Sequence, residues 1–172
     1  PIVAKDRTAS SHARVTLPGR WFPFVLPCRW KAWAKLNSLK GAGVLVTGAG
    51  RGIGKRLAIG FAQNGARVGL LARSKTELDL AQLEIEHAGG VALRLRADVN
   101  DHEQLVGAVD RMRVQFGDVR VLVCAAAVQG YIGPFAGSPT KSWAEIFQTN
   151  LFGVMNSCRA VLPHMIERRA GK

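Results

Sequence analysis

Residues 47–54 read Thr47-Gly48-Ala49-Gly50-Arg51-Gly52-Ile53-Gly54, directly after an apolar run at residues 43–46 and before a helix-forming segment that begins at Lys55. Glycines in such a turn allow positive φ and let the backbone approach a phosphate. The N-terminus of the following helix attracts negative charge. The order strand, glycine turn, helix therefore indicates a cradle for a dinucleotide pyrophosphate, although a glycine turn alone also occurs in tight turns that bind nothing.

The rest of the chain alternates between predicted strands and helices. Strands are expected at residues 66–72, 91–97 and 119–126, because each is a short, largely apolar run. Such alternation is typical of parallel strands joined by covering helices. The sequence thus predicts an α/β fold, a Rossmann-like doubly wound parallel sheet that is incomplete at its C-terminal side.

The predicted helices have recognisable start signals. Ser74-x-x-Glu77 is a capping box, and Gly89-Gly90 ends the helix that it opens. A helix is expected over residues 101–116, and a second capping box, Ser142-x-x-Glu145, opens a helix that runs through Asn150 towards Met165. Helical spacing predicts that these apolar residues are buried: Leu78, Ala81, Leu83, Ile85, Leu105, Ala108, Val109 and Met112.

The spacing Gly48-x-x-x-Gly52-x-Gly54 resembles the T-G-x-x-x-G-I-G fingerprint of the short-chain dehydrogenase/reductase family. The resemblance extends from about Leu39 to the end of the chain. It implies an oxidoreductase that transfers hydride between a nicotinamide cofactor and a small-molecule carbonyl or alcohol substrate. It also implies cofactor contacts from the whole turn, namely Gly48, Ala49, Gly50, Arg51, Gly52, Ile53 and Gly54.

The charge after the second strand predicts NADP(H) as the cofactor. An acidic residue at that place accepts hydrogen bonds from the ribose hydroxyls of NAD and repels the 2′-phosphate of NADP. This chain has Ala72 followed by Arg73 there. Arg73 and Arg51 offer planar donors suited to a phosphate, and they match the paired basic positions of NADP-preferring family members.

Three further segments are compared with the family pattern. Asp98-Val99 resembles the D-V pair that faces the adenine ring, and Asn150 matches a helix asparagine that supports a water-linked proton relay, which makes it the candidate catalytic residue. Where the family usually has N-N-A-G, this chain has Cys124-Ala125-Ala126-Ala127. The hydrogen bonds of the missing asparagines must therefore be lost or made otherwise. Ala125 and Ala126 remain candidate cofactor contacts, with Ala125 limited to its backbone.

The family's catalytic signature is a Ser followed by Y-x-x-x-K. Tyr131 is the only tyrosine here, it precedes Asn150, and Phe135 stands four residues after it. The resemblance therefore predicts the cofactor-binding part of a longer reductase, inactive as a fragment, whose full-length form is a homo-oligomer. A non-catalytic dinucleotide-binding or regulatory protein is the alternative. A methyltransferase is disfavoured, because it would want an acidic residue at Ala72 or Arg73.

The positive charge is concentrated near the N-terminus. The first 40 residues contain eight Lys or Arg and one acidic residue, +7 of the total +12. We expect a basic, disordered or artefactual extension at residues 1–38 and a partial dinucleotide-binding Rossmann domain at residues 39–172. The apolar segment at residues 21–27 is too short for a membrane span, which needs about 20 residues. Neither a nucleic-acid nor a membrane partner is assigned, although contacts of the extension stay open.

Cysteines and histidines give no further site. Cys28, Cys124 and Cys158 form no C-x-x-C pair, and the four histidines show no ligand spacing. No metal is expected, and idle thiols are typical of a reducing, cytoplasmic location.

Overall fold

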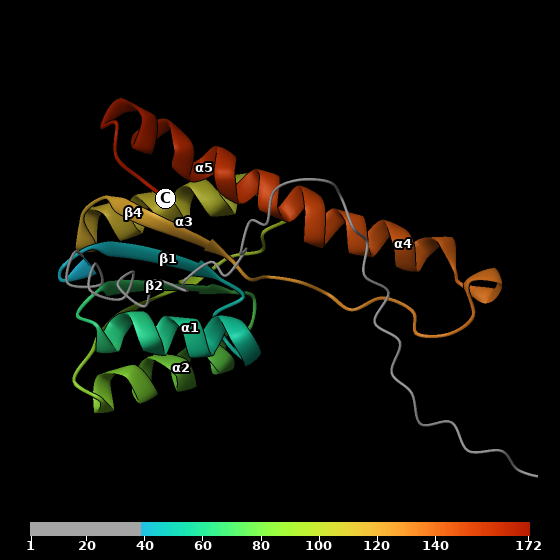
Figure 1. Cartoon of the computed structure of the whole chain (residues 1–172), viewed down its shortest axis with the longest axis horizontal. Helices are drawn as coiled ribbons and strands as arrows, with labels where there is room; N and C mark the ends of the chain where they lie inside the picture. The colour runs from blue at the N-terminus through green and yellow to red at the C-terminus, as the bar shows by residue number, and fades with distance from the viewer. Residues whose placement is uncertain (1–38) are drawn as a thin grey trace, which may run out of the picture. The chain divides into compact units, whose positions relative to one another are not determined.

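The computed structural model describes residues 39–172, which form a four-stranded parallel sheet with helices on both faces (Figure 1). The strand order is β3-β2-β1-β4, so the first strand is central. The Rossmann-like fold predicted from the sequence is confirmed. The strands are β1 (Gly43–Thr47), β2 (Arg67–Ala72), β3 (Val91–Arg96) and β4 (Val119–Cys124). The helices are α1 (Gly52–Gln63), α2 (Lys75–His87), α3 (His102–Phe116), α4 (Thr140–Phe147) and α5 (Gly153–Glu167).

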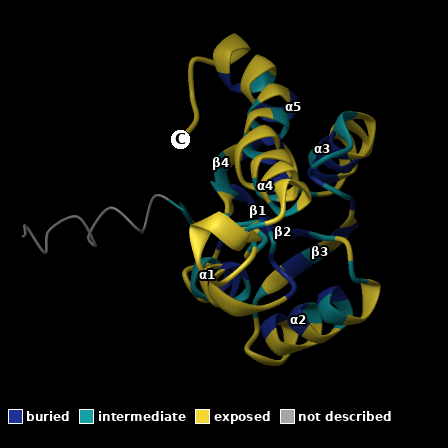
Figure 2. Ribbon diagram, turned by 90° about the vertical axis from the view of Figure 1, so that its right-hand side faces the viewer, coloured by how far each residue is buried: buried dark blue, intermediate teal, exposed yellow. Residues whose placement is uncertain are grey.

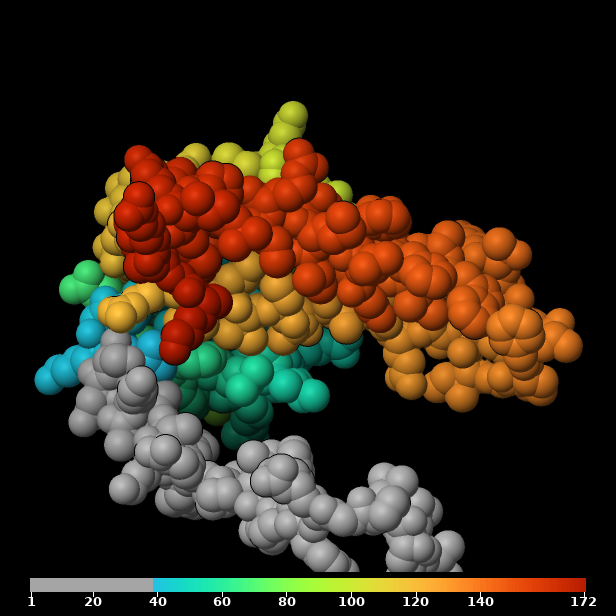
Figure 3. Space-filling view, turned by 45° about the horizontal axis from the view of Figure 1, so that its top comes forward, coloured from blue at the N-terminus to red at the C-terminus, as the bar shows by residue number. Residues whose placement is uncertain are grey.

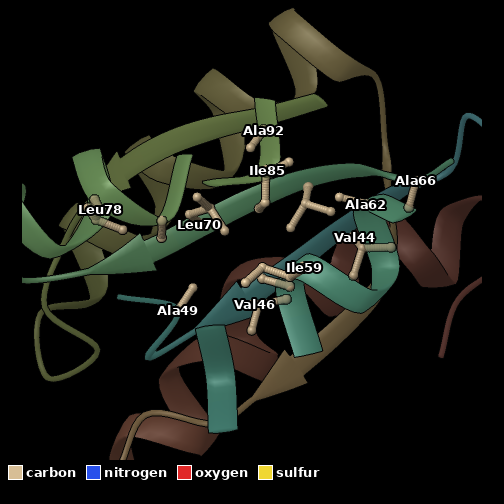
Figure 4. Packing of buried hydrophobic residues seen from close by; sticks show 13 residues of the cluster. Val44, Val46, Ala49, Ile59, Ala62, Ala66, Leu70, Leu78, Ile85 and Ala92 are labelled. Atoms are coloured by element: carbon tan, nitrogen blue, oxygen red, sulfur yellow. The ribbon is translucent and has the colours of Figure 1, made fainter. Parts of the chain in front are cut away.

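Alternate residues of the strands supply two apolar cores. Val44 and Val46 of β1 point to the face covered by α1 and α2, where they meet Ile59 and Ile85 (Figure 4). Leu45, between them in sequence, belongs to the core under α3 and α5. Because the sheet is covered on both faces, every residue of β1 is buried. This explains why residues 43–46 are all apolar and do not alternate with polar residues.

Side-chain caps fix the starts of two helices, at Ser74, where a capping box was predicted, and at Asp101, where only the start of a helix was predicted. The Ser74 hydroxyl accepts a hydrogen bond from the Glu77 N–H at 3.3 Å, and the Asp101 carboxylate accepts one from Gln104 N–H at 3.1 Å. The residues predicted to be buried on these helices are buried, with one exception. Leu83 is 49% exposed, because it lies on the side of α2 opposite the stripe that carries Leu78, Ala81 and Ile85.

The start of α4 differs from the prediction. The helix begins at Thr140 with Pro139 as its N-cap residue, so Ser142 lies within the first turn and is no cap. The Ser142 hydroxyl instead accepts a hydrogen bond from Tyr131 N–H at 2.8 Å. The bond ties the loop after β4 to the helix, and this loop also contains a single turn of 3₁₀ helix, Phe135–Gly137.

The predicted long helix through Asn150 is interrupted by a π-helical segment, Gln148–Phe152, which joins α4 to α5 without a break in direction (Figure 1). The space-filling view shows α4 and the loop before it projecting past the rest of the described residues (Figure 3). Because α4 has few neighbours, none of its eight residues is buried, and the ribbon is mostly exposed there (Figure 2).

β4 ends at Cys124, two residues earlier than predicted, and forms one edge of the sheet. Lys172 extends this edge: its N–H donates to Arg120 O at 3.0 Å, and its carbonyl accepts from Leu122 N–H at 2.9 Å. The last residue of the chain thus starts a strand-like pairing beside β4.

The base of the described region is held by an ion-pair network. Asp118, just before β4, lies 3.3 Å from Arg113 of α3 and 3.2 Å from Arg168 after α5. Arg168 also donates to Val119 O at 3.1 Å. These contacts join α3, β4 and the end of α5 at the amino end of β4, which is the end of the sheet opposite the glycine turn.

The predicted basic extension at residues 1–38 lies outside the described residues, as does Cys28. Among the described residues, no helix is long and apolar enough to cross a membrane.

Candidate functional site: a cleft at the carboxyl edge of the sheet

A cleft of about 800 Å³ opens where the carboxyl ends of β1, β2 and β4 meet. This is the point at which the strand order reverses direction from β1, and ligands of doubly wound sheets bind at such a point. Eleven of the twelve predicted cofactor residues line it: Gly48, Gly50, Arg51, Gly52, Ile53, Gly54, Arg73, Asp98, Val99, Ala125 and Ala126. Ala49 is the exception, since it is fully buried behind the turn and donates its N–H to Leu71 O at 3.1 Å.

The turn approaches the end of β4 closely at Gly48. Gly48 has φ +66°, and a Cβ placed there would lie 2.7 Å from the Ala125 carbonyl oxygen and from Ala126 N. Any side chain at this position would therefore push the two walls of the cleft apart. The requirement for glycine is both conformational and steric.

Thr47 holds the backbone of the segment in which the family's asparagines are missing. Its hydroxyl accepts from Ala125 N–H at 3.1 Å and from Ala126 N–H at 3.2 Å. Thr47 is only 1% exposed, so these bonds are shielded from water. The two bonds hold the backbone of this segment through a side chain of β1. The Ala125-Ala126 segment is held in place without side-chain polar groups of its own.

The N-terminus of α1 faces the cleft without a cap. Its N-cap residue, Arg51, makes no side-chain capping bond, and no acidic residue lies in the first turn. The first helical bond runs from Lys55 N–H to Arg51 O at 3.2 Å, which leaves the N–H groups of Gly52, Ile53 and Gly54 without helical partners. Free N–H groups and the helix dipole together suit an anion of the size of a pyrophosphate.

Both candidate phosphate-reading arginines are at the mouth of this cleft, and each has a carboxylate beside it. Arg51 Nε lies 3.7 Å from Glu77 Oε1, and Arg73 NH1 lies 3.8 Å from Asp98 Oδ2. The two arginine side chains are 84% and 66% exposed. Pairs so long and so exposed contribute little to stability, typically less than about 1 kcal/mol. Each arginine can therefore leave its carboxylate for another anion at a small cost in free energy.

Asp98 is held by its own loop. Its carboxylate accepts from Asn100 N–H at 2.9 Å, and its own N–H donates to Gln104 Oε1 at 3.1 Å. Val99 beside it is buried and lines the cleft. The predicted Asp98-Val99 pair therefore forms a fixed wall next to Arg73.

Asn150 contacts the loop after β4. Its side-chain oxygen accepts from Val128 N–H at 2.8 Å, and its side-chain nitrogen donates to Val128 O at 3.0 Å. Both polar ends of one amide are thus used on a single residue of the cleft wall. Asn150 lies in the π-helical segment, a kind of irregularity that is frequent at functional sites.

Sequence reasoning missed three residues of this site: Thr47, Glu77 as a neighbour of Arg51, and Val128. Thr47 was quoted as the first residue of the fingerprint but assigned no role, and nothing in the sequence links it to residues almost 80 positions away. For Glu77 the sequence predicted only a place in the capping box that begins at Ser74. No sequence signal identifies Val128, because its contacts use the backbone.

Two cysteines without a sequence motif are close in space. Cys124 at the end of β4 forms a side-chain contact with Cys158 of α5. Desolvation of the thiol, together with this neighbour, raises the pKa of Cys124 to about 11. Among residues 39–172, no group of three or more His, Cys, Asp or Glu side chains is placed to hold a metal ion.

The comparisons with known proteins agree on one family. The model of the short chain dehydrogenase family matches residues 42–172. Gluconate 5-dehydrogenase of Gluconobacter oxydans is 38% identical over 137 residues, 80% of this chain and 53% of that protein.

Two solved structures show the same similarity. An NAD⁺-bound xylitol dehydrogenase has a TM-score of 0.75 at 30% identity over 77% of this chain and 51% of its own. A gluconate 5-dehydrogenase from Burkholderia cenocepacia in complex with NADP and tartrate has a TM-score of 0.71 at 32% identity over 77% and 52%. The chain thus spans about half the length of the relatives described here.

Proposed function

The chain belongs to the short-chain dehydrogenase family, and on that premise we propose that it is the NADP(H)-binding part of an oxidoreductase that transfers hydride between the cofactor and a small carbonyl or alcohol substrate. The observation that carries the proposal is the cleft itself. The uncapped N-terminus of α1, the close approach at Gly48 and two exposed arginines lie around one cavity. Membership in the family also leaves no support for the methyltransferase alternative.

The residues of the cleft fit the parts of NADP(H) in order. The free N–H groups at Gly52, Ile53 and Gly54 would hold the pyrophosphate, and Asp98-Val99 would face the adenosine. Arg51 and Arg73 would bind the 2′-phosphate, and Ala72 offers no carboxylate to repel it. Solved relatives bind either NAD⁺ or NADP, so it is the arginines of this chain that support NADP(H).

The cofactor, when bound, supplies the hydride. This chain's own residues bind and orient it. Ala125 and Ala126, fixed by Thr47, would form the wall beside the nicotinamide half, and Asn150 would position the next stretch of that wall through Val128. We assign Asn150 a positioning role in catalysis, because its side-chain amide is engaged on the backbone of the cleft wall.

We propose that the described residues, 39–172, supply no group to exchange the substrate proton. Tyr131 has Phe135 four positions on, and its N–H is bound to Ser142, which places it on the loop before α4 and not among the residues that line the cleft. We therefore propose that this chain binds the cofactor and does not turn it over alone. For the whole protein, we propose dehydrogenase or reductase activity on a small hydroxy or keto compound.

The experiment is to titrate the purified chain with NADPH, following the cofactor's fluorescence, and then to record NADPH oxidation with gluconate-type keto acids, simple ketones and quinones. Binding without turnover is the expected result. Absence of binding would remove the proposal. Turnover that survives Tyr131→Phe would contradict the assignment of a binding part, since it requires a proton donor among these residues.

A further inference from the structure

We propose that Glu77 opposes binding of the 2′-phosphate by competing for Arg51, so that this carboxylate sets how strongly the cleft prefers NADP(H) over NAD(H). The inference rests on the proposed function, in which Arg51 and Arg73 bind that phosphate. It concerns a residue whose sequence motif predicts only a structural role.

The first observation is that Glu77 does not complete the capping box. In that motif the glutamate side chain returns to the N–H of the N-cap residue, here Ser74. The Ser74 hydroxyl does accept from Glu77 N–H at 3.3 Å, but among the described residues no bond from the Glu77 carboxylate to Ser74 N–H is formed. The carboxylate is turned instead to Arg51, 3.7 Å away. Its backbone is thus fixed by the cap while its charge faces the cleft.

The second observation is that Glu77 packs against the glycine turn. A Cβ placed on Gly50 would lie 2.8 Å from Glu77 Cβ and 2.9 Å from Glu77 Oε2. The carboxylate therefore borders the segment that would cradle the cofactor phosphates. A carboxylate at that place adds negative charge where an anion is to bind, which a site selected only for phosphate affinity would avoid.

The third observation separates Glu77 from Asp98, the other carboxylate beside a phosphate-reading arginine. Asp98 accepts from Asn100 N–H at 2.9 Å and so has a structural partner besides Arg73. The Glu77 carboxylate has Arg51 as its polar partner among the described residues. Removing the Glu77 charge therefore frees Arg51 without disturbing another hydrogen bond of the site.

The expected consequence is selective. With Glu77 present, the 2′-phosphate must displace a carboxylate from Arg51, whereas NAD⁺ makes no demand on that arginine. Glu77→Gln should tighten NADP⁺ binding about two- to fivefold, the factor that corresponds to an exposed ion pair. NAD⁺ binding should tighten less, because NAD⁺ shares the pyrophosphate beside Glu77 but has no 2′-phosphate for Arg51 to bind.

The test is calorimetric titration of the full chain with NADP⁺ and NAD⁺, in wild type, Glu77→Gln and the control Glu86→Gln. Glu86 carries the same charge on the same helix, but its carboxylate accepts from Gln82 and it does not line the cleft. A rise in the ratio of NADP⁺ to NAD⁺ affinity in Glu77→Gln alone supports the inference. An unchanged ratio, or an equal rise in the control, overturns it.

The role of Arg51 is tested by repeating Glu77→Gln in an Arg51→Met background. The gain in NADP⁺ affinity should disappear there, because the guanidinium for which Glu77 and the 2′-phosphate compete is missing. A gain of unchanged size would overturn the competition for Arg51. If wild type binds neither dinucleotide, the proposed function itself fails, and this outcome differs from every result above.

Discussion

At the scale of single residues, the site depends on a few polar side chains that hold its backbone segments in place. Thr47 is the main example, because one buried hydroxyl accepts two N–H groups from the end of β4. Its position at the first place of the fingerprint gives it access to both the turn and the neighbouring strand.

We predict that Thr47→Val lowers the free energy of unfolding by about 1–3 kcal/mol, because two buried N–H groups lose their acceptor while the side-chain shape is kept. Denaturant unfolding of the chain measures this. Thr47→Ser, which keeps the hydroxyl, is the matched control and should lose much less. Equal stability of the Val variant and the wild type would show that Thr47 does not hold the segment.

The thiol of Cys124 gives a pH-dependent prediction. Its pKa is raised to about 11, mainly by desolvation and then by Cys158, so the thiol is protonated at neutral pH. Alkylation by iodoacetamide should be slow at pH 8 and should rise towards a midpoint near 11. The unfolded chain ionises earlier, so the contribution of this thiol to stability is lost as the pH rises from 9 to 11.

Peptide-resolved mass spectrometry follows the alkylation of Cys124 separately from the other cysteines. Cys158→Ser should move the midpoint to lower pH, since the second cause of the raised pKa is removed. A midpoint near that of an ordinary thiol in the folded chain would contradict the contact between β4 and α5.

At the scale of elements, local sequence signals predict where helices and strands form, but they do not predict which distant residues contact them. The cap at Ser74 and the buried stripe of α3 were predicted from spacing alone, because a local bond and helical periodicity determine them. At Asp101 the sequence predicted the start of a helix but not the cap that the structure shows. Ser142 was misassigned for a physical reason: Tyr131 N–H, a partner from a distant loop, takes the hydroxyl that the motif reserves for a cap. Leu83 was misassigned because it was grouped with the buried stripe although helical spacing puts it on the opposite side of α2.

For the site, too, the sequence predicts local motifs but not the contacts between distant segments. Residues that act through the backbone conformation of one turn, such as Gly48 and Gly54, are visible in the sequence as a motif. The pairing of Thr47 with Ala125, of Arg51 with Glu77 and of Asn150 with Val128 depends on the way parallel strands bring their ends together. Such pairings follow from the fold and have no fixed sequence spacing.

The π-helical segment yields a prediction at this scale. In Asn150→Ala, Val128 loses both a donor and an acceptor, so its amide should exchange with solvent faster, by about tenfold for a bond of ordinary strength. Hydrogen exchange read by NMR tests this at a single residue. Asn156→Ala, which removes a bond to Val99 O, is the control and should leave the Val128 amide unchanged. If the Val128 amide exchanges at the same rate in wild type and Asn150→Ala, the proposed positioning role of Asn150 is contradicted.

At the scale of the whole molecule, two apolar cores hold a sheet whose carboxyl edge is left open as a cleft. Asp118 forms its ion pairs at the opposite, amino end of the strands. One end of the sheet thus carries the cleft, and the other carries contacts between α3, β4 and the end of α5. The first two β-α turns and the segment after β4 line this cleft together although they are up to about 80 residues apart, and we propose that cofactor binding depends on them.

The central claim is that this cleft binds NADP(H) through arginines that read its 2′-phosphate. It is tested most directly by the affinities of NADP⁺ and NAD⁺ for wild type and Arg73→Asp, measured by calorimetry under the same salt conditions. The account predicts that wild type prefers NADP⁺ and that Arg73→Asp weakens NADP⁺ binding by about 1.5–3 kcal/mol, with a smaller loss for NAD⁺. Equal losses for the two cofactors, or a wild type that prefers NAD⁺, would contradict it.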